Sequence, residues 1–303
     1  MKKIYILLVI SLLSSGLFAQ QLSLNTQYAF NRFLINPAVA GNQDYIPLRL
    51  TARQQWTGID GAPSTQSVSG HKKIAGRNMG IGGYLFMDRF GPETKIGFQL
   101  SYSYIMKMGF GENTKLALGI AARGVQYKLD YSILKASDVN DALLGAESES
   151  AFVPDADLGV YLYSQTYFVG ISAAQLISMD LNLKNAVDKN ALERHYNFMA
   201  GYKYKLDEDF DIEPSVYIKY TTSAPLNIDI NARCIYQDNY WAGLSYRTSN
   251  TLAIMVGAQY KNFVFGYAYD YSMSEIKHYQ GGSHEIILGY NINRKVSRGS
   301  SMM

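Results

Sequence analysis

Short stretches in which apolar and polar residues alternate constrain the fold of this chain more than any other feature of its sequence. In the stretch Thr94–Met106, nearly every second residue is large and apolar, and most of the residues between them are small, polar or charged. A period of two residues is that of a β-strand, in which neighbouring side chains point to opposite faces of the sheet. The repeated pattern therefore predicts a sheet with one apolar face and one polar face.

We expect about fourteen such strands, most of them close in length to the ~9–11 residues that a tilted strand needs to cross a bilayer. An even number is usual in bacterial barrels, and a missed or split strand would leave about 12 or 16. The predicted strands are Leu48–Gln55, Thr65–Lys72, Met79–Met87, Lys95–Met106, Lys115–Tyr127, Ala156–Tyr163, Tyr167–Ala174, Tyr196–Lys205, Asp211–Tyr220, Asn227–Tyr236, Tyr240–Arg247, Leu252–Tyr260, Phe263–Tyr271 and His284–Ile292.

The composition favours a membrane barrel over a water-soluble protein. The chain has 25 Tyr and 13 Phe, yet its mean hydropathy is only -0.11. Strands that are apolar on one face only have such an average, and aromatic residues gather at membrane interfaces. No apolar run long enough for a spanning helix follows Ala19. The predicted fold class is therefore all-β, a transmembrane antiparallel β-barrel.

Four regions are predicted along the chain. Residues 1–19 have the basic start, apolar centre and small-residue end of a signal peptide, with cleavage before Gln20 or Gln21. Residues 20–47 form an aromatic lead-in without periodicity, which we expect to pack in or under the barrel, a disordered lead-in being the alternative. The barrel covers residues 48–292. Residues 293–303 form a basic tail.

The lengths of the connections predict the orientation of the barrel. Short connections such as 164–165, 237–239 and 261–262 alternate with long ones such as 130–155, 175–195 and 272–283. Outer-membrane barrels have short periplasmic turns and long extracellular loops. We therefore expect both termini in the periplasm and the long loops outside the cell.

The inward positions of the predicted strands carry charges of both signs. Mixed signs indicate ion pairs across the lumen rather than a selectivity filter of one sign. The residues predicted to form these pairs are Arg49, Arg53, Arg123, Arg233, Asp229, Asp270 and Glu285. The single cysteine, Cys234, excludes a disulfide within the chain and is expected to be a small buried apolar residue.

Signals for an enzyme are weak in this sequence. The four histidines lack the spacing of a metal site, and Ser283 and His284 would point to opposite faces of a strand. The net charge of +3 includes two lysines of the signal peptide, so nucleic acid is not an expected partner. We predict no catalytic residue, no cofactor, no metal and no small-molecule substrate.

The connection after the first predicted strand is rich in glycine and proline, which indicates a structured turn. A tryptophan at the end of a strand is also typical of the aromatic girdle of a barrel. We nevertheless take this turn as the candidate partner-binding site, made of Trp56, Thr57, Gly58, Ile59, Asp60, Gly61 and Pro63.

Three sequence blocks together resemble the PorP/SprF family of the type IX secretion system. They are Asn36–Gly41, Arg53–Pro63 and Gly281–Ile286, the last followed by Leu288–Tyr290. The resemblance implies an outer-membrane barrel that supports export or surface attachment of large secreted proteins, including adhesins of gliding bacteria. It also implies one cognate secreted partner, contacts with secretion components and no catalytic residues.

Two other functions remain open at this stage. A barrel of about fourteen strands can enclose a narrow passive channel, although mixed inward charges and an aromatic lead-in favour a filled lumen. An outer-membrane hydrolase would need a catalytic group such as His284, and no constellation of residues supports it.

Overall fold

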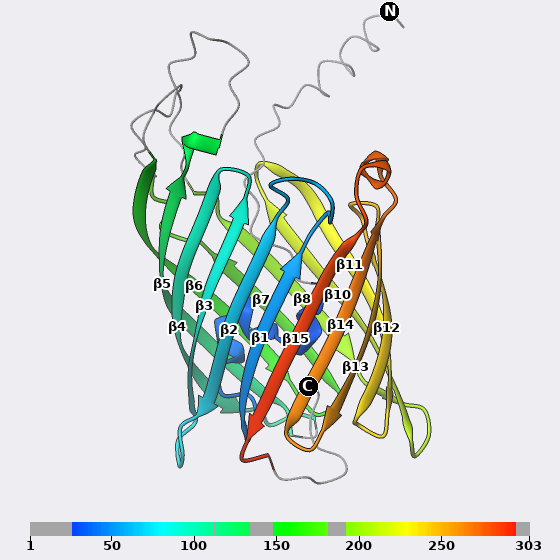
Figure 1. Cartoon of the computed structure of the whole chain (residues 1–303). Coiled ribbons are helices and arrows are strands. Elements are labelled where there is room, and N and C mark those ends of the chain that lie inside the picture. The colour runs from blue at the N-terminus through cyan, green and yellow to red at the C-terminus, as the bar shows by residue number, and fades with distance from the viewer. Residues whose placement is uncertain (1–25, 112, 134–147, 181–191, 295–303) are drawn as a thin grey trace, which may run out of the picture.

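A computed structural model describes residues 26–111, 113–133, 148–180 and 192–294 of the chain. Its strands form one antiparallel sheet that closes into a barrel when β1 pairs with β15 and β10 pairs with β11 (Figure 1). Both β8 and β9 pair with β10, so they form one wall strand that is interrupted at Lys203. The wall therefore has 14 strands, which confirms the predicted fold class. No helix among the described residues is long and apolar enough to cross a membrane.

The strands follow the predicted order closely. The main difference is β6, which begins at Glu149 instead of Ala156, because Pro154 and Asp155 interrupt the apolar alternation in the sequence. The strands are β1 Ile46–Gln54, β2 Ser64–Lys73, β3 Met79–Phe90, β4 Glu93–Lys107, β5 Lys115–Leu129, β6 Glu149–Tyr163, β7 Tyr167–Ala174, β8 His195–Tyr202, β9 Tyr204–Lys205, β10 Phe210–Thr221, β11 Ala224–Tyr236, β12 Tyr240–Arg247, β13 Thr251–Tyr260, β14 Phe263–Ser272 and β15 Ser283–Ile292.

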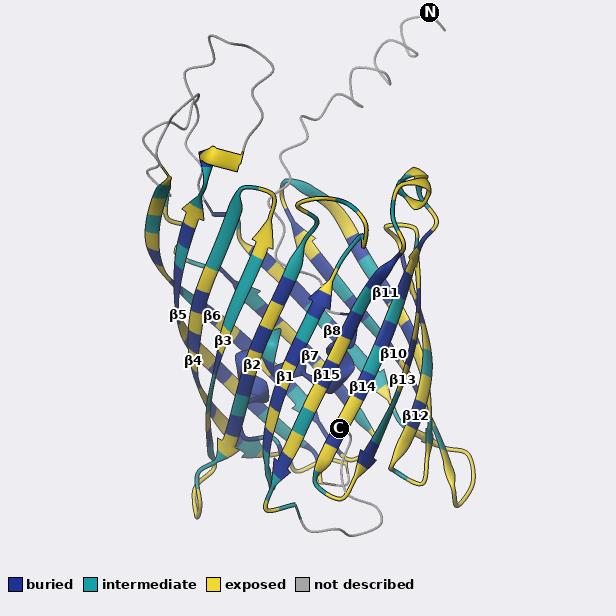
Figure 2. Cartoon of the chain, viewed as in Figure 1, coloured by how far each residue is buried: buried dark blue, intermediate teal, exposed yellow. Residues whose placement is uncertain are grey.

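The two faces of the wall differ as the period of two requires. Buried and exposed residues alternate along most strands, and Figure 2 shows this as dark blue and yellow bands, with teal where a residue is half-buried. In β4 the outward Leu100 is 63% exposed, whereas its inward neighbour Gln99 is 1% exposed. Cys234 is exposed on the outer face of β11, so the expectation that it is buried was wrong. Its outward place in the alternation was correct, but no group of the described residues covers that position.

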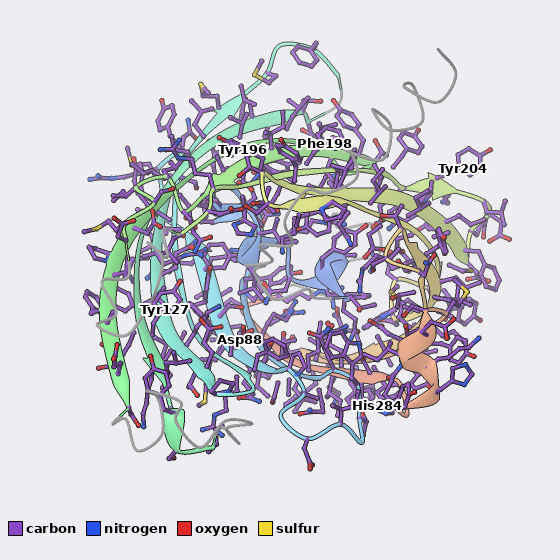
Figure 3. The ribbon with its side chains drawn as sticks, turned by 90° about the horizontal axis from the view of Figure 1, so that it is seen from above. Asp88, Tyr127, Tyr196, Phe198, Tyr204 and His284 are labelled. Carbon is purple, nitrogen blue, oxygen red and sulfur yellow. The ribbon has the colours of Figure 1, made fainter. Side chains whose placement is uncertain are left out.

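The described part of the lead-in, which begins at Thr26, lies inside the barrel (Figure 3). It forms three short 3₁₀ turns, η1 Tyr28–Phe30, η2 Arg32–Leu34 and η3 Pro37–Val39. Most of its apolar residues form one buried cluster with inward residues of the wall, which include Tyr84, Tyr161 and Met199, and Phe30 packs in a second cluster with Trp241. Burial of its aromatic rings stabilises this segment in the lumen through the hydrophobic effect.

Inward glycines of the wall allow the lead-in to approach the strands closely. A Cβ atom on Gly119 of β5 would lie 2.2 Å from the backbone nitrogen of Ala38, and one on Gly80 of β3 would lie 2.1 Å from the carbonyl oxygen of Ala40. A Cβ on Gly159 of β6 would lie 2.0 Å from Asn36 Oδ1. Only glycine leaves room at such positions. The wall is therefore shaped to this segment.

The connections at the two ends of the barrel differ in length. The end reached by the connections 55–63, 130–148, 175–194 and 273–282 is called the loop end here. At the opposite end, called the turn end, the connections include 164–166, 237–239 and 261–262. β15 ends at the turn end, close to Asn293. Thr26, by contrast, lies near the loop end, because it contacts Arg53 and Asp270, which lie close to the ends of β1 and β14 at that side of the barrel.

Three of the predicted regions lie wholly or partly outside the described residues. These are the whole signal peptide, residues 1–19 with its cleavage site at Gln20 or Gln21, the first part of the lead-in, residues 20–25, and the part of the basic tail after Arg294. The structure therefore gives no description of these parts.

Candidate functional site: the filled lumen and its vestibule

A buried cluster of charged side chains holds the start of the described lead-in near the loop end. The guanidinium group of Arg53 pairs with Asp270 at 2.7 Å and with Glu285 at 3.1 Å. Glu285 accepts hydrogen bonds from the backbone amides of Thr26, at 2.7 Å, and Gln27, at 3.0 Å. The Thr26 hydroxyl donates to Asp270 at 2.7 Å. All five residues are almost completely buried, so the lead-in is part of this network.

Arg247 extends the same cluster along the wall. Its guanidinium group pairs with Asp229 at 2.8 Å and lies 3.6 Å from Asp270. Asp229 also accepts a hydrogen bond from the Ser245 hydroxyl. Hydrogen-bonded charge pairs of this kind are expected where charges are buried, because an unpaired buried charge is costly. We call Arg53, Arg247, Asp229, Asp270 and Glu285 the loop-end charge cluster.

A second group of charged residues, on the turn-end side of this cluster, binds the lead-in to the wall. Glu213 of β10 pairs with Arg32 of the lead-in at 3.0 Å and with Arg233 of β11 at 2.6 Å. The Arg32 guanidinium also lies 3.8 Å from the centre of the Phe168 ring, and that of Arg233 lies 4.3 Å from the Phe30 ring. Such cation–π contacts add to the attraction between the two parts.

The remaining predicted arginines have other partners. Arg123 pairs with Asp157 at 2.7 Å and donates to Tyr84 and Gln99. Arg49 donates to the side chain of Asn291 at 2.8 Å, and no carboxylate of the described residues lies within ion-pair distance of it. The structure thus brings Arg53, Asp270 and Glu285 together, whereas Arg233 and Asp229 each pair with another residue.

Sequence reasoning missed Arg32, Asp157 and Arg247 as partners in these pairs. Asp157 and Arg247 could have been predicted from the alternation of their strands, and Arg247 also from strand register. Both occupy inward positions in the alternation of their strands, and Arg247 lies directly opposite Asp229 in the register of β11 and β12. Arg32 carried no such signal, because the lead-in has no periodicity.

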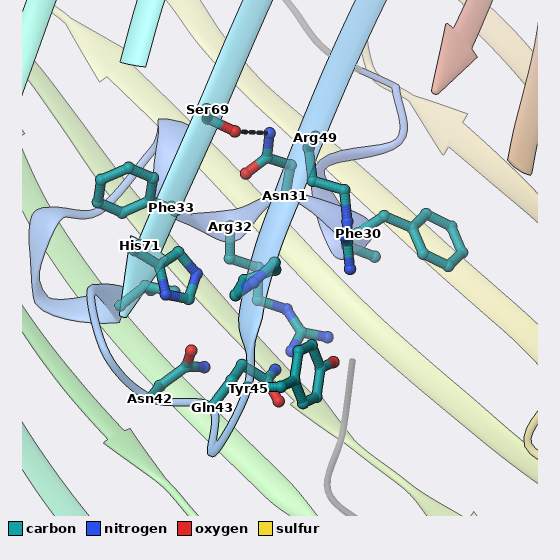
Figure 4. Close-up of a pocket in the computed structure, with 13 residues that line it drawn as sticks. Phe30, Asn31, Arg32, Phe33, Asn42, Gln43, Tyr45, Arg49, Ser69 and His71 are labelled. Atoms are coloured by element: carbon teal, nitrogen blue, oxygen red, sulfur yellow. Dashed lines mark hydrogen bonds between the residues drawn. The ribbon is translucent and has the colours of Figure 1, made fainter. Parts of the chain in front are cut away.

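Between the lead-in and strands β1 and β2, toward the turn end, lies a water-sized cavity of about 30 Å³ (Figure 4). It is lined by polar groups that include Asn42, Arg49 and His71. The ring of His71 accepts a hydrogen bond from the Gly41 amide at 3.2 Å, and Asn31 donates to the Ser69 hydroxyl at 2.9 Å. The lead-in is therefore bonded to β2 at this level as well.

Above the lead-in, a cavity of about 730 Å³ lies at the loop end. We call it the vestibule. Its floor includes Arg53, Arg247 and Asp270, and its wall includes Trp56, Pro63, Phe90, Leu226 and Ile276. The vestibule shares no lining residue with the cavity near the turn end, and the lead-in lies between them.

The predicted partner-binding loop forms part of the vestibule rim. Its Trp56 and Pro63 line the cavity, whereas Thr57, Gly58, Asp60 and Gly61 are exposed and Ile59 is half-buried. Trp56 thus faces the vestibule and not a lipid girdle. The loop is held by the segment before β15: the Thr57 amide donates to the Gly282 carbonyl at 2.8 Å, and the Gly281 amide donates to the Thr57 carbonyl at 2.7 Å.

These bonds bring two of the recognised sequence blocks together, since Arg53–Pro63 and Gly281–Ile286 lie side by side. Ser283 and His284 point to opposite faces. The Ser283 hydroxyl accepts a hydrogen bond from the Trp56 amide. On the outer face, the His284 ring and the Tyr267 hydroxyl form a hydrogen bond of 2.7 Å. Within the described ranges, no group of three or more His, Cys, Asp or Glu could hold a metal ion.

The sequence matches the model of one protein family over nearly its whole length. That family is described as type IX secretion system membrane protein PorP/SprF, and the match covers residues 17–290. The chain belongs to the PorP/SprF family. The resemblance seen in the three sequence blocks is therefore confirmed. No curated protein matches the chain in sequence.

Solved structures support the fold of this PorP/SprF chain. It is similar to the CymD monoaromatic hydrocarbon channel, with a TM-score of 0.51 and 13% identity, over 91% of this chain and 94% of that one. It is also similar to the Ralstonia pickettii toluene transporter TbuX, with a TM-score of 0.51 and 8% identity, over 88% of this chain and 93% of that one. At such identities the likeness concerns the outer-membrane barrel fold alone.

Proposed function

We propose that this barrel anchors or assists the export of a large secreted or surface protein of the type IX system, a gliding adhesin being one such cargo. It does so by contacts at its loop end, and the partner does not pass through its lumen. Membership of the PorP/SprF family supports a role in secretion. The filled lumen is the observation that carries the mechanism, because a chain cannot be threaded through a barrel that its own lead-in occupies.

The contacts of the lead-in support a plug that is fixed and not a gate that swings open. Arg32 and Thr26 are held by buried ion pairs and hydrogen bonds, and Asn36 donates to the backbone carbonyls of Val160 and Ile171. Removing one partner of a buried pair typically costs about 3–5 kcal/mol. Several such contacts would have to break together before the lumen could open. This argues against the passive channel as the main function.

The proposed orientation places the loop end outside the cell and the turn end in the periplasm. Long connections gather at one end of the barrel, as they do on the outer side of outer-membrane barrels. In this orientation β15 ends in the periplasm and the vestibule opens to the outside. The chain before Thr26 lies outside the described residues, so the proposal fixes the side of the C-terminal end of β15 only.

A capture experiment with matched variants tests the proposed function. The tagged full-length protein is purified from outer membranes in detergent, and proteins that copurify are identified by mass spectrometry. Asp60→Lys changes an exposed residue of the loop-end rim, and Asp207→Lys makes the same change in an exposed turn at the opposite end. We expect one large secreted protein to copurify with the wild type and with Asp207→Lys, and to be lost from Asp60→Lys.

The deletion strain supplies the contradicting outcome. If the gene is removed and every type IX cargo is still secreted and displayed at its normal level, the protein has no role in anchoring or export. If the barrel also copurifies with no partner, the passive channel becomes the favoured function.

A further inference from the structure

We propose that the small cavity between the lead-in and strands β1 and β2 binds a monovalent inorganic anion such as chloride, beside the guanidinium group of Arg49 (Figure 4). Such an ion would link the lead-in to the wall, whatever partner the loop end binds. Three features of this cavity carry the proposal: a positively charged lining, hydrogen-bond donors on the wall, and a size that admits a small ion but no larger ligand.

The charged residues that line this cavity are arginines. Arg32 and Arg49 belong to the lining, and none of the described residues that form it is an aspartate or a glutamate. The carboxylate of Glu213 pairs with Arg32 at 3.0 Å, but it also pairs with Arg233, at 2.6 Å. One carboxylate therefore serves two guanidinium groups, and the lining of the cavity keeps an excess of positive charge.

Arg49 is buried, and no carboxylate of the described residues lies within ion-pair distance of it. Its Nη1 atom donates to two neutral acceptors, the Leu48 carbonyl at 2.9 Å and Asn291 Oδ1 at 2.8 Å. Asp44 is exposed and does not line the cavity, and Arg294, which interacts electrostatically with Arg49, is a second cation. A buried charge without a counter-charge is costly, so an anion beside Arg49 is stabilised.

Other residues of the lining can donate hydrogen bonds to the same ion. Ser69 lies directly opposite Arg49 in the register of β1 and β2, and its oxygen accepts from Asn31, which leaves its hydrogen for another acceptor. The Nδ1 atom of His71 accepts from the Gly41 amide, so the neutral ring has its proton on Nε2. The lining thus offers O–H and N–H donors besides the guanidinium group, and hydrogen bonds to a charged acceptor are the stronger kind.

The volume of the cavity limits the ligand to a small one. The cavity measures about 30 Å³, and about 10–15 Å³ is enough to hold one water molecule. A chloride ion is somewhat larger than a water molecule and still fits, whereas a sugar, a nucleotide or a peptide does not. A water molecule also fits but carries no charge, so it leaves Arg49 without a counter-charge. Since Arg49 carries a single positive charge, the preferred ion is monovalent.

Unfolding of the purified full-length protein in detergent tests this proposal. The midpoint of unfolding in urea is measured over a series of sodium chloride concentrations, with sodium gluconate added to hold the ionic strength constant. Gluconate is too large for the cavity. A ligand that binds only the folded state stabilises it more as the ligand concentration rises. We expect the midpoint to rise as chloride replaces gluconate, and bromide to act like chloride.

A variant with a built-in anion identifies the site. Ser69→Asp would place a carboxylate opposite Arg49, so its midpoint should no longer depend on chloride. Arg49→Met should abolish the dependence as well, because it removes the charge that holds the ion, and Arg49→Lys should retain part of it. Arg89→Met removes an exposed arginine of the outer face and should leave the dependence unchanged. Heat-modifiable mobility on gels checks that each variant is folded.

Crystals of the wild-type protein grown in bromide locate the ion directly. We expect an anomalous bromide peak in the cavity beside Arg49, and no such peak in Ser69→Asp. Equal midpoints in chloride and gluconate, an equal chloride response of the wild type and Ser69→Asp, or the lack of a bromide peak in the cavity would overturn the proposal. A stronger response to acetate than to chloride would also overturn it, and would indicate a carboxylate group of a partner protein as the ligand.

Discussion

Adding one methyl group to Gly119 should loosen the lead-in from the wall of the barrel. The Cβ atom of Gly119→Ala would lie 2.2 Å from the Ala38 nitrogen and 2.5 Å from the Ala38 Cα atom. Ordinary contact begins near 3.4 Å, so the lead-in would have to move by about 1.2 Å, the difference between 3.4 and 2.2 Å. Its anchors resist this movement, because the Ser103 hydroxyl donates to the Ala40 carbonyl. Overpacking of this kind costs about 1–3 kcal/mol.

The matched control is Gly124→Ala in the same strand. Gly124 points outward, and the atoms nearest to a Cβ atom there are the ring ends of Phe98 and Phe152, which can rotate away. Unfolding in urea, with the protein in detergent micelles, measures both variants. A Trp56→Phe background leaves Trp241 as the only tryptophan, and its ring centre lies 4.5 Å from that of Phe30 in the lead-in. Equal stability of the two alanine variants would refute the close packing of the lead-in against β5.

Two further predictions concern the faces of the wall. Leu100→Arg places a charge on the outer face, where it should cost about 2–4 kcal/mol near the midplane of the bilayer, whereas Leu100→Ala should cost much less; equal losses in unfolding experiments would mean that Leu100 does not face lipid. Arg53→Met removes the guanidinium group that pairs with both Asp270 and Glu285, leaves Asp270 with the longer contact to Arg247, and should cost about 3–5 kcal/mol. Arg89→Met, which removes an exposed outward arginine, is its control, and similar unfolding free energies for the two variants would contradict the buried ion pairs.

The sequence predicted the wall of the barrel well because the period of two is imposed on every strand. Once the apolar face of a strand must meet lipid, a register shift by one residue would turn that face inward. For this reason the inward placement of Arg53, Asp270 and Glu285 could be read from single strands. Two ion pairs were also predictable from hairpin register. Glu213 and Arg233 lie directly opposite each other in β10 and β11, as do Asp229 and Arg247 in β11 and β12.

The contacts that fill the lumen were harder to predict from the sequence. Arg53 meets Glu285 only because β1 and β15 close the barrel, and this pairing joins residues at opposite ends of the chain. The path of the lead-in depends on contacts with many strands at once, so no local pattern marked Arg32 as the partner of Glu213. The vestibule likewise arises from loops that are far apart in the sequence, such as those that carry Trp56 and Ile276.

The conductance of the purified protein in planar lipid bilayers tests the central claim most directly, namely that the lead-in fills the lumen and the barrel works through its surface. A variant lacking residues 28–41, which removes the turns η1 to η3, is measured beside it. We expect the wild type to give no steady current and the folded deletion variant to conduct. A steady ohmic current through the wild type, equal to that of the variant, would contradict the account and support a passive channel.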